Sequence, residues 1–377
     1  MPGKRLRHSA FTLVLGVLLI LAGCAPSPAP PAASPAPTSP PPKPTMAASP
    51  APAKPTAAPA ASPAASPAAT PAAPAPVAGI PTVNPVAGKQ FRVAFSVPAL
   101  SFPFFQVMER VIKEEASRLN VTIITYDGQD STTKQTADIE AAIAQRVDGI
   151  IISPKDVDAL VPVLEQAAAA NIPIVTIDRT INKQDILLGH VGADNVEGGR
   201  LQAQYVLDRL KDRAEKIRVV VLRGTPGSSP ERDRSRGIFE VFDANKDRVE
   251  VVFDQTAQFR RAEAANVMEA AITATGGQID AVVAENDEMI EGASQVIRAK
   301  GLEGKVLMVG FDAISETLDH IKQGTIHATI EQWPGRQASG ALNMLYDFLA
   351  NGKRPAQKIN LIKPTLITQD NINETEQ

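Results

Sequence analysis

Residues 91–127 read FRVAFSVPALSFPFFQVMERVIKEEASRLNVTIITYD, and this stretch gives the clearest indication of the fold. Its two ends, FRVAFSV and VTIITYD, are short runs of apolar and β-branched residues, which are typical of buried strands. Between them, FFQVMERVIKEEASRL has apolar residues at the spacing of one helix face. A strand, a helix and a second strand in this order predict a parallel βαβ unit.

The same alternation continues along the chain. Further runs of strand composition are GIIISP (149–154), IPIVTID (172–178), ILLGHVG (186–192), IRVVVLRG (217–224), VEVVFDQ (249–255), AVVAEN (281–286), VLMVGFD (306–312) and IHATIEQ (326–332). Segments with helical spacing, such as QTADIEAAIAQRV, lie between most of them. The alternation predicts an α/β fold of doubly wound parallel sheets. Because about 290 residues with about ten strands exceed one compact sheet, we expect two lobes.

The composition argues against several classes of protein. The chain has 377 residues, a formal charge of −3 and a pI near 5.9, whereas a nucleic-acid partner requires a basic face. Its single cysteine, Cys24, excludes a disulfide framework, and its four histidines lack metal-ligand spacing. The sequence shows no nucleophile–base pair, and GGR at 198–200 lacks the spacing of a phosphate-binding loop. We therefore expect no nucleic acid, no metal, no cofactor and no enzymatic activity.

The N-terminus has the pattern of an export signal. Lys4, Arg5 and Arg7 precede the apolar run FTLVLGVLLILAG, which is shorter than the roughly 20 residues that a membrane-spanning helix needs. The run ends in LAGC, which resembles the lipobox of bacterial lipoproteins. This resemblance implies a cleaved signal peptide over residues 1–23 and a lipid on Cys24. The alternative is an ordinary cleaved signal followed by an incidental cysteine.

Residues 24–88 have the composition of a tether. They consist almost entirely of Ala, Pro, Ser and Thr, and they hold most of the 32 prolines of the chain. Such a segment lacks the bulky apolar residues that offset the entropy of ordering, and its prolines favour extended conformations. We expect either a stalk that holds the folded part away from a membrane or a passive spacer.

Polar and aromatic residues follow the predicted strands at their carboxyl ends, where open α/β sheets bind ligands. They are Phe102, Pro103, Phe104, Phe105, Asp178, Arg179, Asn286, Asp287, Asp312 and Gln332. Acids, amides and guanidinium groups form paired hydrogen bonds with hydroxyls, and aromatic rings pack on C–H faces, so the set suits a sugar. Each residue type has a structural alternative: an aspartate can cap the next helix, a phenylalanine can belong to the core, and Arg234 can be a solvated helix residue. Asp178 and Asp312 can also act in principle as acid and base.

Residues 91–368 resemble the ribose/galactose group of type I periplasmic sugar-binding proteins. The matching stretches are PFF (103–105), IPIVTIDR (172–179), ADN (193–195), RSRG (234–237), NVM (266–268), ENDEM (285–289), VGFD (309–312) and ATIEQ (328–332). The resemblance implies two lobes that are joined by three crossovers near Ala193, Gln332 and Ile362. The lobes would comprise 89–192 plus 333–362 at the N-terminal side and 193–332 plus 363–377 at the C-terminal side.

The resemblance also implies a ligand site. Phe104 and Phe259 match the rings that sandwich the sugar, and Phe105 lines the same pocket. Asp178 and Arg179 match the acid and base that bind adjacent hydroxyls. The remaining polar contacts correspond to Arg234, Asn286, Asp312 and Gln332.

Three positions on the N-terminal lobe depart from the pattern of the ribose binders. Pro98 and Phe102 stand where those proteins have a hydroxyl and an amide, and Ser153 replaces an asparagine. Phe102 and Ser153 are still expected to contact the ligand. The departures indicate a ligand other than ribose within the same class.

Together, these resemblances imply a monomeric, extracytoplasmic solute-binding lipoprotein that captures a monosaccharide or related polyol and delivers it to an ABC permease. It would be anchored to the outer face of the cell membrane or lie in the periplasm. The alternative is a sugar-sensing receptor component that presents its bound sugar to a membrane partner. A sugar-responsive regulator of the same fold needs a helix-turn-helix before the first strand, where residues 1–88 have a signal and a tether.

Overall fold

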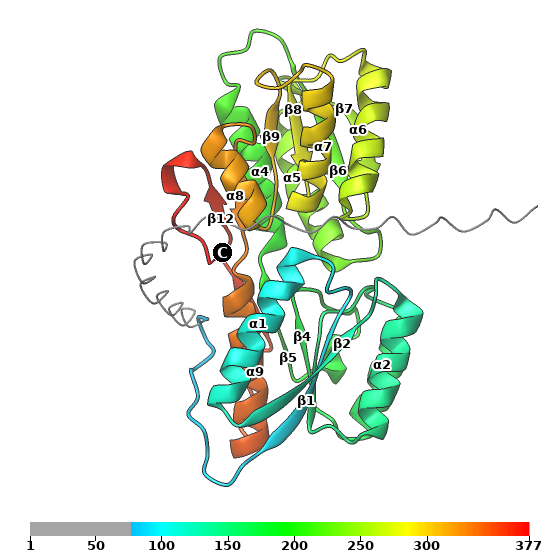
Figure 1. Ribbon diagram of the computed structural model, residues 1–377, viewed down its shortest axis with the longest axis vertical. Helices are drawn as coiled ribbons and strands as arrows, with labels where there is room; N and C mark the ends of the chain where they lie inside the picture. Colours follow the sequence, from blue (N-terminus) through cyan, green and yellow to red (C-terminus); the bar gives the residue numbers. More distant parts are fainter. Residues whose placement is uncertain (1–76, 377) are drawn as a thin grey trace, which may run out of the picture. The chain divides into compact units, whose positions relative to one another are not determined.

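The computed structural model describes residues 77–376, which form two α/β lobes (Figure 1). The predicted signal peptide, the predicted lipid-anchor residue Cys24 and the tether up to residue 76 lie outside the described residues. Among residues 77–376, no helix is long and apolar enough to cross a membrane.

The N-terminal lobe contains a sheet of six parallel strands in the order β11-β5-β4-β3-β1-β2. The strands are β1 (Phe91–Val97), β2 (Val121–Asp127), β3 (Gly149–Ile152), β4 (Ile174–Ile177), β5 (Gly189–Ala193) and β11 (Ile359–Ile362). The two helices that cover one face are α1 (Pro103–Arg118) and α9 (Pro334–Asn351). Those on the other face are α2 (Thr132–Ala144) and α3 (Val161–Ala169), and a 3-10 turn, Gln184–Ile186, precedes β5. Because helices cover both faces, β3, β4 and β5 are buried at every residue.

The C-terminal lobe repeats this arrangement on a smaller sheet of parallel strands in the order β7-β6-β8-β9. The strands are β6 (Ile217–Arg223), β7 (Val249–Thr256), β8 (Ala281–Ala284) and β9 (Leu307–Val309). Its helices are α4 (Asn195–Arg209) and α5 (Ser229–Ala244) on one face, α6 (Arg261–Thr275) and α7 (Asp287–Ala299) on the other, and α8 (Ser315–Gln323). A separate antiparallel pair joins β10 (Thr329–Glu331) to β12 (Thr365–Ile367), and a 3-10 turn, Gln369–Asn371, follows. The predicted α/β fold with two doubly wound parallel sheets is therefore confirmed.

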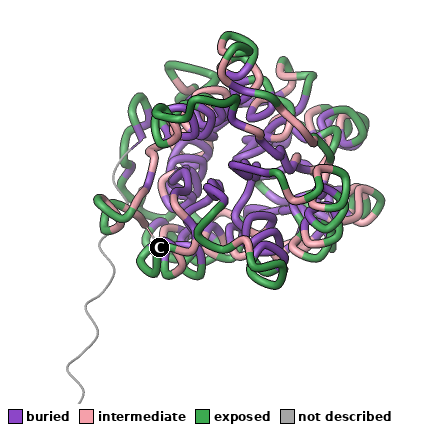
Figure 2. The backbone as a smooth tube through the Cα atoms, turned by 90° about the horizontal axis from the view of Figure 1, so that it is seen from above, coloured by how far each residue is buried: buried purple, intermediate pink, exposed green. Residues whose placement is uncertain are grey.

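Each lobe has its own hydrophobic core on both sides of its sheet. The largest fully buried side chains of the N-terminal lobe include Tyr346, Phe95 and Met108. Figure 2 shows the buried segments toward the interior and the exposed residues mainly on the outer turns. The loops at the carboxyl ends of the strands are thus anchored to well-packed strands and helices.

The chain crosses between the lobes after β5, β10 and β11, near Ala193, Gln332 and Ile362. At the second crossing, Trp333 has a left-handed φ of 63°. Its indole Nε1 donates to the backbone oxygen of Lys363 at the third crossing, at a distance of 3.2 Å. The crossings are therefore linked to one another as well as to the lobes.

Each predicted run overlaps an observed strand, but several of these strands end earlier than predicted, and β10 in the run 326–332 is antiparallel to β12 instead of lying in a parallel sheet as expected. The predicted run 306–312 holds β9 only as far as Val309, and the run 172–178 ends before its last residue. The last residues of the two predicted runs, Asp178 and Asp312, have φ values of 58° and 118°, which an extended strand does not accommodate. The chain turns at these residues instead.

The C-terminal end of the predicted tether belongs to the folded N-terminal lobe. Val77, Ile80 and Val83 are buried in the core formed with α1 and α9. The Val83 N–H also donates to Asn343 Oδ1 at 3.1 Å. The prediction of a tether that extends to residue 88 therefore does not hold for this end, because apolar side chains three residues apart give it a buried face.

Candidate binding site

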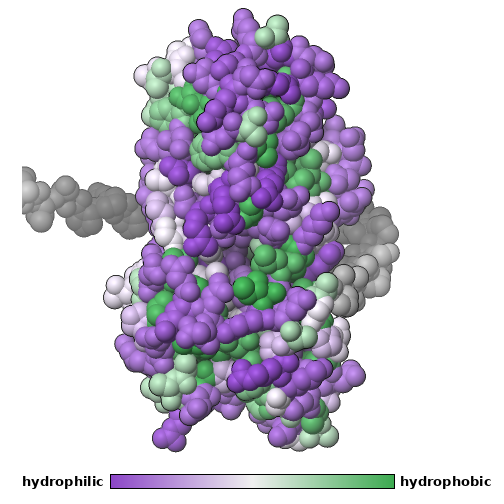
Figure 3. Space-filling model, turned by 180° about the vertical axis from the view of Figure 1, so that it is seen from behind, coloured by the Kyte–Doolittle hydropathy of each residue, from purple (hydrophilic) through white to green (hydrophobic). Residues whose placement is uncertain are grey.

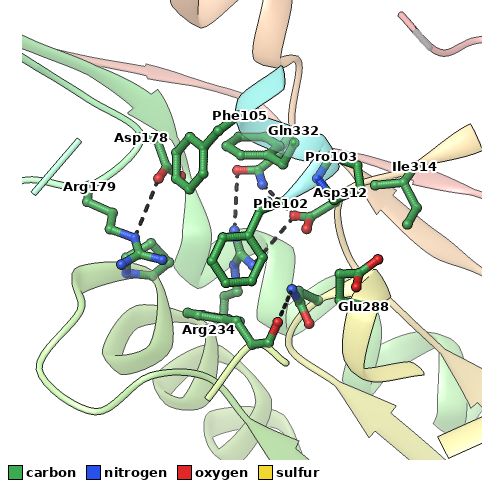
Figure 4. Close-up of a pocket in the computed structure, with 14 residues that line it drawn as sticks. Phe102, Pro103, Phe105, Asp178, Arg179, Arg234, Glu288, Asp312, Ile314 and Gln332 are labelled. Carbon is green, nitrogen blue, oxygen red and sulfur yellow. Dashed lines mark hydrogen bonds and ion pairs between the residues drawn. The ribbon is translucent and has the colours of Figure 1, made fainter. Parts of the chain in front are cut away.

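A cavity lies between the lobes, at the carboxyl ends of the strands of both sheets. The space between its lining atoms is about 430 Å³, including the part open to solvent. Its lining consists of Phe102, Pro103, Phe104, Phe105, Asp178, Arg179, Pro230, Arg234, Phe259, Asn286, Glu288, Asp312, Ile314 and Gln332 (Figure 4). On the face shown in Figure 3, hydrophilic residues cover most of the surface and hydrophobic ones form separate patches, one of which lies midway between the lobes.

Aromatic rings enter the cavity from both lobes. Phe104 and Phe105 belong to the first turn of α1, with their ring centroids 5.3 Å apart, and Phe102 is the N-cap of this helix. Phe259 comes from the loop between β7 and α6 in the other lobe. Its ring lies directly against Gly224, where an added Cβ would come within 2.0 Å of the ring, so a glycine is required there. The rings thus form apolar surfaces suited to the C–H faces of a ligand.

Strained backbone is concentrated around this cavity. Asp178, Phe259 and Asp312 all have positive φ, and for a bulky residue such as Phe259 this conformation is rare. Such residues cost roughly 1–3 kcal/mol each and cluster at ligand sites, where the surrounding structure holds them in place. The strain directs these three side chains into the cavity from the loops that follow β4, β7 and β9.

Asp178 and Arg179 occupy the turn that ends β4. Because Asp178 has a φ of 58°, two consecutive side chains reach the same cavity. Asp178 Oδ2 accepts a hydrogen bond from Ser153 Oγ at 2.9 Å and lies 3.7 Å from Arg179 Nε. Burial raises the pKa of Asp178, and the charges of Arg179 and Arg234 oppose this rise. The buried Arg179 Nε forms no hydrogen bond among residues 77–376, and its nearest anion is this Asp178 carboxylate.

Arg234, Asp312 and Gln332 form a connected network on the other side of the cavity (Figure 4). Arg234 Nη2 donates to Gln332 Oε1 at 3.3 Å, and Gln332 Nε2 donates to Asp312 Oδ1 at 2.6 Å. Arg234 also donates from Nε to Asn195 Oδ1 at 2.8 Å, and its guanidinium lies 3.6 Å above the centre of the Phe311 ring. Burial raises the pKa of Asp312 to about 7, against the opposing charge of Arg234. The network fixes the orientation of every member before any ligand contact.

Asn286 combines a structural role with its place in the cavity wall. Its Oδ1 accepts from the N–H of Met289 at 3.0 Å and caps α7, while its Nδ2 donates to the backbone oxygen of Phe259 at 3.2 Å. The neighbouring Asp287 is turned away and accepts hydrogen bonds from Thr329 Oγ1 and the N–H of Ile314. Asp287 is therefore a structural residue rather than part of the lining.

The structure brings together ten of the predicted site residues, which are Phe102, Phe104, Phe105, Asp178, Arg179, Arg234, Phe259, Asn286, Asp312 and Gln332. Their role in binding a ligand remains a prediction. Ser153 is fully buried behind Asp178 and does not line the cavity, so the structure does not support the expected direct contact with the ligand. Instead, its hydroxyl orients the Asp178 carboxylate. Arg234 is 2% exposed, which excludes the alternative of a solvated helix residue.

Three lining residues were not among the predicted ones: Pro230, Glu288 and Ile314. All three lie in or next to the first turn of a helix that follows a strand of the C-terminal lobe. The rule that placed Asn286 and Asp312 at strand ends would have found them, had it been extended a few residues into each helix. No group of three or more metal-binding side chains occurs within the described part of the chain.

Comparisons with known proteins agree with this geometry. The periplasmic binding protein domain family matches residues 93–354. The ribose import binding protein of Bacillus subtilis is 35% identical over 275 residues, which are 72% of this chain and 86% of that protein. The crystal structure of the Caulobacter myo-inositol binding protein bound to myo-inositol has a TM-score of 0.72 and 35% identity, covering 77% of this chain and 97% of that chain. A galactofuranose binding protein structure has a TM-score of 0.71 and 29% identity, covering 75% and 96%.

Proposed function

Since the chain belongs to the periplasmic binding protein family, whose sugar-binding members serve ABC transporters and are not enzymes, we propose that it binds a monosaccharide or related polyol between its lobes and delivers it to an ABC permease. The observation that carries this proposal is the cavity in which aromatic rings and charged hydrogen-bonding groups of both lobes converge. The family also implies a location outside the cytoplasm.

A sugar matches both kinds of lining. Its hydroxyls can donate to the carboxylates of Asp178 and Asp312 and accept from the guanidinium groups of Arg179 and Arg234. Its C–H faces can pack on the phenylalanine rings that enter from the two lobes. Because the polar groups come from both lobes, one small ligand satisfies all of them only when the lobes meet.

The charges of the lining favour a neutral ligand. The carboxylates of Asp178, Glu288 and Asp312 line the same cavity as the guanidinium groups of Arg179 and Arg234. A phosphate or carboxylate on the ligand would lie close to these acids and would require desolvation of a further negative charge. We therefore propose an uncharged sugar or polyol rather than a sugar phosphate or sugar acid.

Phe102 restricts the ligand further on the side of the N-terminal lobe. Its ring is half-buried and lies 6.4 Å from the ring of Phe105 at the cavity wall. A ligand hydroxyl directed at Phe102 would be buried without a partner, which costs roughly 1–3 kcal/mol. We propose a ligand with few polar groups on this edge, such as a deoxysugar, or a pose that keeps its hydroxyls away from the ring.

The proposal includes a lipid anchor on Cys24 and a tether up to residue 76, both outside the described residues. The basic start, the short apolar run and the LAGC sequence support the anchor. Attachment to the membrane would keep a monomeric binding protein close to its permease and raise the local concentration of one near the other.

Calorimetric titration of the purified protein with D-ribose, D-galactose, L-fucose, xylitol and myo-inositol tests the proposed function. We expect saturable binding of at least one of them. We also expect a rise in thermal stability, about 2.7 kcal/mol at a hundredfold excess over the dissociation constant. If none of these neutral sugars and polyols binds, while a charged metabolite does, the proposal is wrong about the ligand class.

A further inference from the structure

A cluster of charged side chains bridges the two lobes beside the cavity. Asp130, on the loop between β2 and α2 of the N-terminal lobe, accepts a hydrogen bond from Arg260, the N-cap of α6 in the C-terminal lobe. The other oxygen of Asp130 accepts from Lys155 of its own lobe. One carboxylate thus pairs with a cation on each side of the cleft.

Two neutral hydrogen bonds join the lobes nearby. The N–H of Val157 donates to the backbone oxygen of Gly227 at 3.0 Å, and the N–H of Thr180 donates to Ser229 Oγ at 3.0 Å. Gly227 has a φ of 85°, and an added Cβ would come within 2.5 Å of a carboxylate oxygen on the facing loop. The positive φ therefore favours a glycine at this position between the lobes.

The charged cluster lies at the mouth of the cleft. Asp130 and Arg260 line a second, more open hollow that also includes Phe102 and Glu288, and both of these residues line the sugar cavity as well. Lys155 connects the cluster to the site from the other direction, because its backbone oxygen accepts from Arg179 Nη1 at 3.4 Å. The Asp130–Arg260 contact therefore borders a hollow that shares two lining residues with the cavity.

We propose that Asp130, Lys155 and Arg260 form a charged latch that holds the lobes together and slows the release of bound sugar. The proposal rests on the proposed function. The Asp130–Arg260 contact joins different lobes, so it exists only when the lobes meet and stabilises that arrangement over a separated one. Burial acts to raise the pKa of Asp130, but the hydrogen bonds from Arg260 and Lys155 outweigh it, so its pKa lies below the usual value.

The substitution Arg260→Gln tests the latch with little risk to the fold. Lys155 remains to pair with Asp130, so no buried carboxylate is left without a cation. A matched control is Arg200→Gln, because the Arg200 side chain is 45% exposed, against 47% for Arg260, and its ion pair with Glu240 lies within one lobe. The hinge residue Trp333 is the single tryptophan of the chain and provides the fluorescence signal.

The experiment is stopped-flow dilution of the protein loaded with D-ribose, D-galactose, L-fucose, xylitol or myo-inositol, using those that bind the wild type. For Arg260→Gln we expect release roughly fivefold faster, as for a partly exposed ion pair, with an association rate changed by less than about twofold. Added salt should accelerate release from the wild type and from Arg200→Gln but not from Arg260→Gln. Asp130→Asn combined with Arg260→Gln should release sugar no faster than Asp130→Asn alone.

Equal release rates for the wild type and Arg260→Gln at low salt would overturn the latch. A release rate that responds to salt equally in both proteins would overturn it too. Failure of the proposed function would give a different result, because the wild type itself would bind none of the sugars. In that case the proposed latch on sugar release would also be wrong.

Discussion

Asp178→Asn is the most direct test of the site. Asparagine is the right substitute because it is compatible with the backbone conformation at this position. At a φ of 58°, an aspartate or asparagine fits the left-handed region, whereas alanine would add a backbone cost of about 1–2 kcal/mol. The asparagine side-chain oxygen can still accept the hydrogen bond from Ser153 Oγ. The substitution therefore removes the charge and one acceptor while leaving the turn and its support in place.

The expected loss follows from the hydrogen bonds that the carboxylate can offer. A charged hydrogen bond contributes about 1.5–3 kcal/mol and a neutral one about 0.5–1.5 kcal/mol. The substitution replaces one or two charged hydrogen bonds to sugar hydroxyls with neutral ones. It should therefore weaken binding by about 1–3 kcal/mol, or roughly 5- to 150-fold in the dissociation constant. The melting temperature of the unliganded protein should change little, because removing a carboxylate that is costly to bury is offset by leaving the buried Arg179 guanidinium without its anion.

Calorimetric titration and thermal melting of the same variant provide the two readings. Ser153→Ala is the matched control, because it removes only the hydroxyl that orients Asp178 and should cost less affinity than Asp178→Asn. Arg179→Lys should weaken binding as well, since an ammonium keeps the charge but loses the fork of donors. If Asp178→Asn lowers the melting temperature and leaves sugar affinity unchanged, Asp178 is a structural partner of Arg179 and the reasoning is refuted.

Three further results are expected. Cys24→Ser should release the protein from the membrane fraction or block its processing, and a fully processed, membrane-bound variant would place the anchor elsewhere. Small-angle scattering should show a smaller radius of gyration with saturating sugar, and an unchanged radius would argue against lobe closure. Finally, the melting temperature should fall between pH 6.5 and 8. Burial raises the folded-state pKa of Asp312 and Glu331 to about 7 and of Glu285 to about 8, above their unfolded values. The folded state therefore binds more protons than the unfolded state, and stability is lost as the pH rises through these values. His190, whose pKa burial lowers to about 4, acts in the opposite direction only below about pH 6.5. Glu331→Gln should reduce the slope, and a melting temperature that rises over this range would contradict the assignment.

The strands that are buried on both faces could be predicted from the sequence, and an exposed edge strand could not. β3 (Gly149–Ile152) and β4 (Ile174–Ile177) are continuous apolar runs, because helices cover both sides of the sheet. β11 (Ile359–Ile362) lies at the edge of the same sheet, and its residues Ile359 and Leu361 are exposed. Its short alternating pattern resembles a surface segment, so only the resemblance to known proteins pointed to a crossing there.

The strand-end rule predicted which residues converge, but not what each side chain contacts. In the sequence, Pro98 and Phe102 both stand where the ribose binders have a polar residue, yet only Phe102 lines the cavity. The backbone oxygen of Pro98 instead accepts a hydrogen bond from the N–H of Asp130 at 2.7 Å. Asn286 was expected to contact the ligand, and it also caps α7 from within the cavity wall. Such outcomes depend on contacts between residues distant in sequence, such as Ser153 with its acceptor carboxylate, which local patterns do not encode.

The two sides of the cavity differ in how far their polar groups are already paired, and this difference suggests an order of binding. Arg234 is held by Asn195 and Gln332, and Gln332 in turn donates to Asp312, so this side presents oriented groups to a ligand at little reorganisation cost. On the other side, Arg179 Nε has no hydrogen-bond partner among the described residues. A sugar that docks first on the paired network of the C-terminal lobe would then present its remaining hydroxyls to Arg179. Satisfying that buried donor would favour the arrangement in which the lobes meet, so the contact that completes binding would also favour closure.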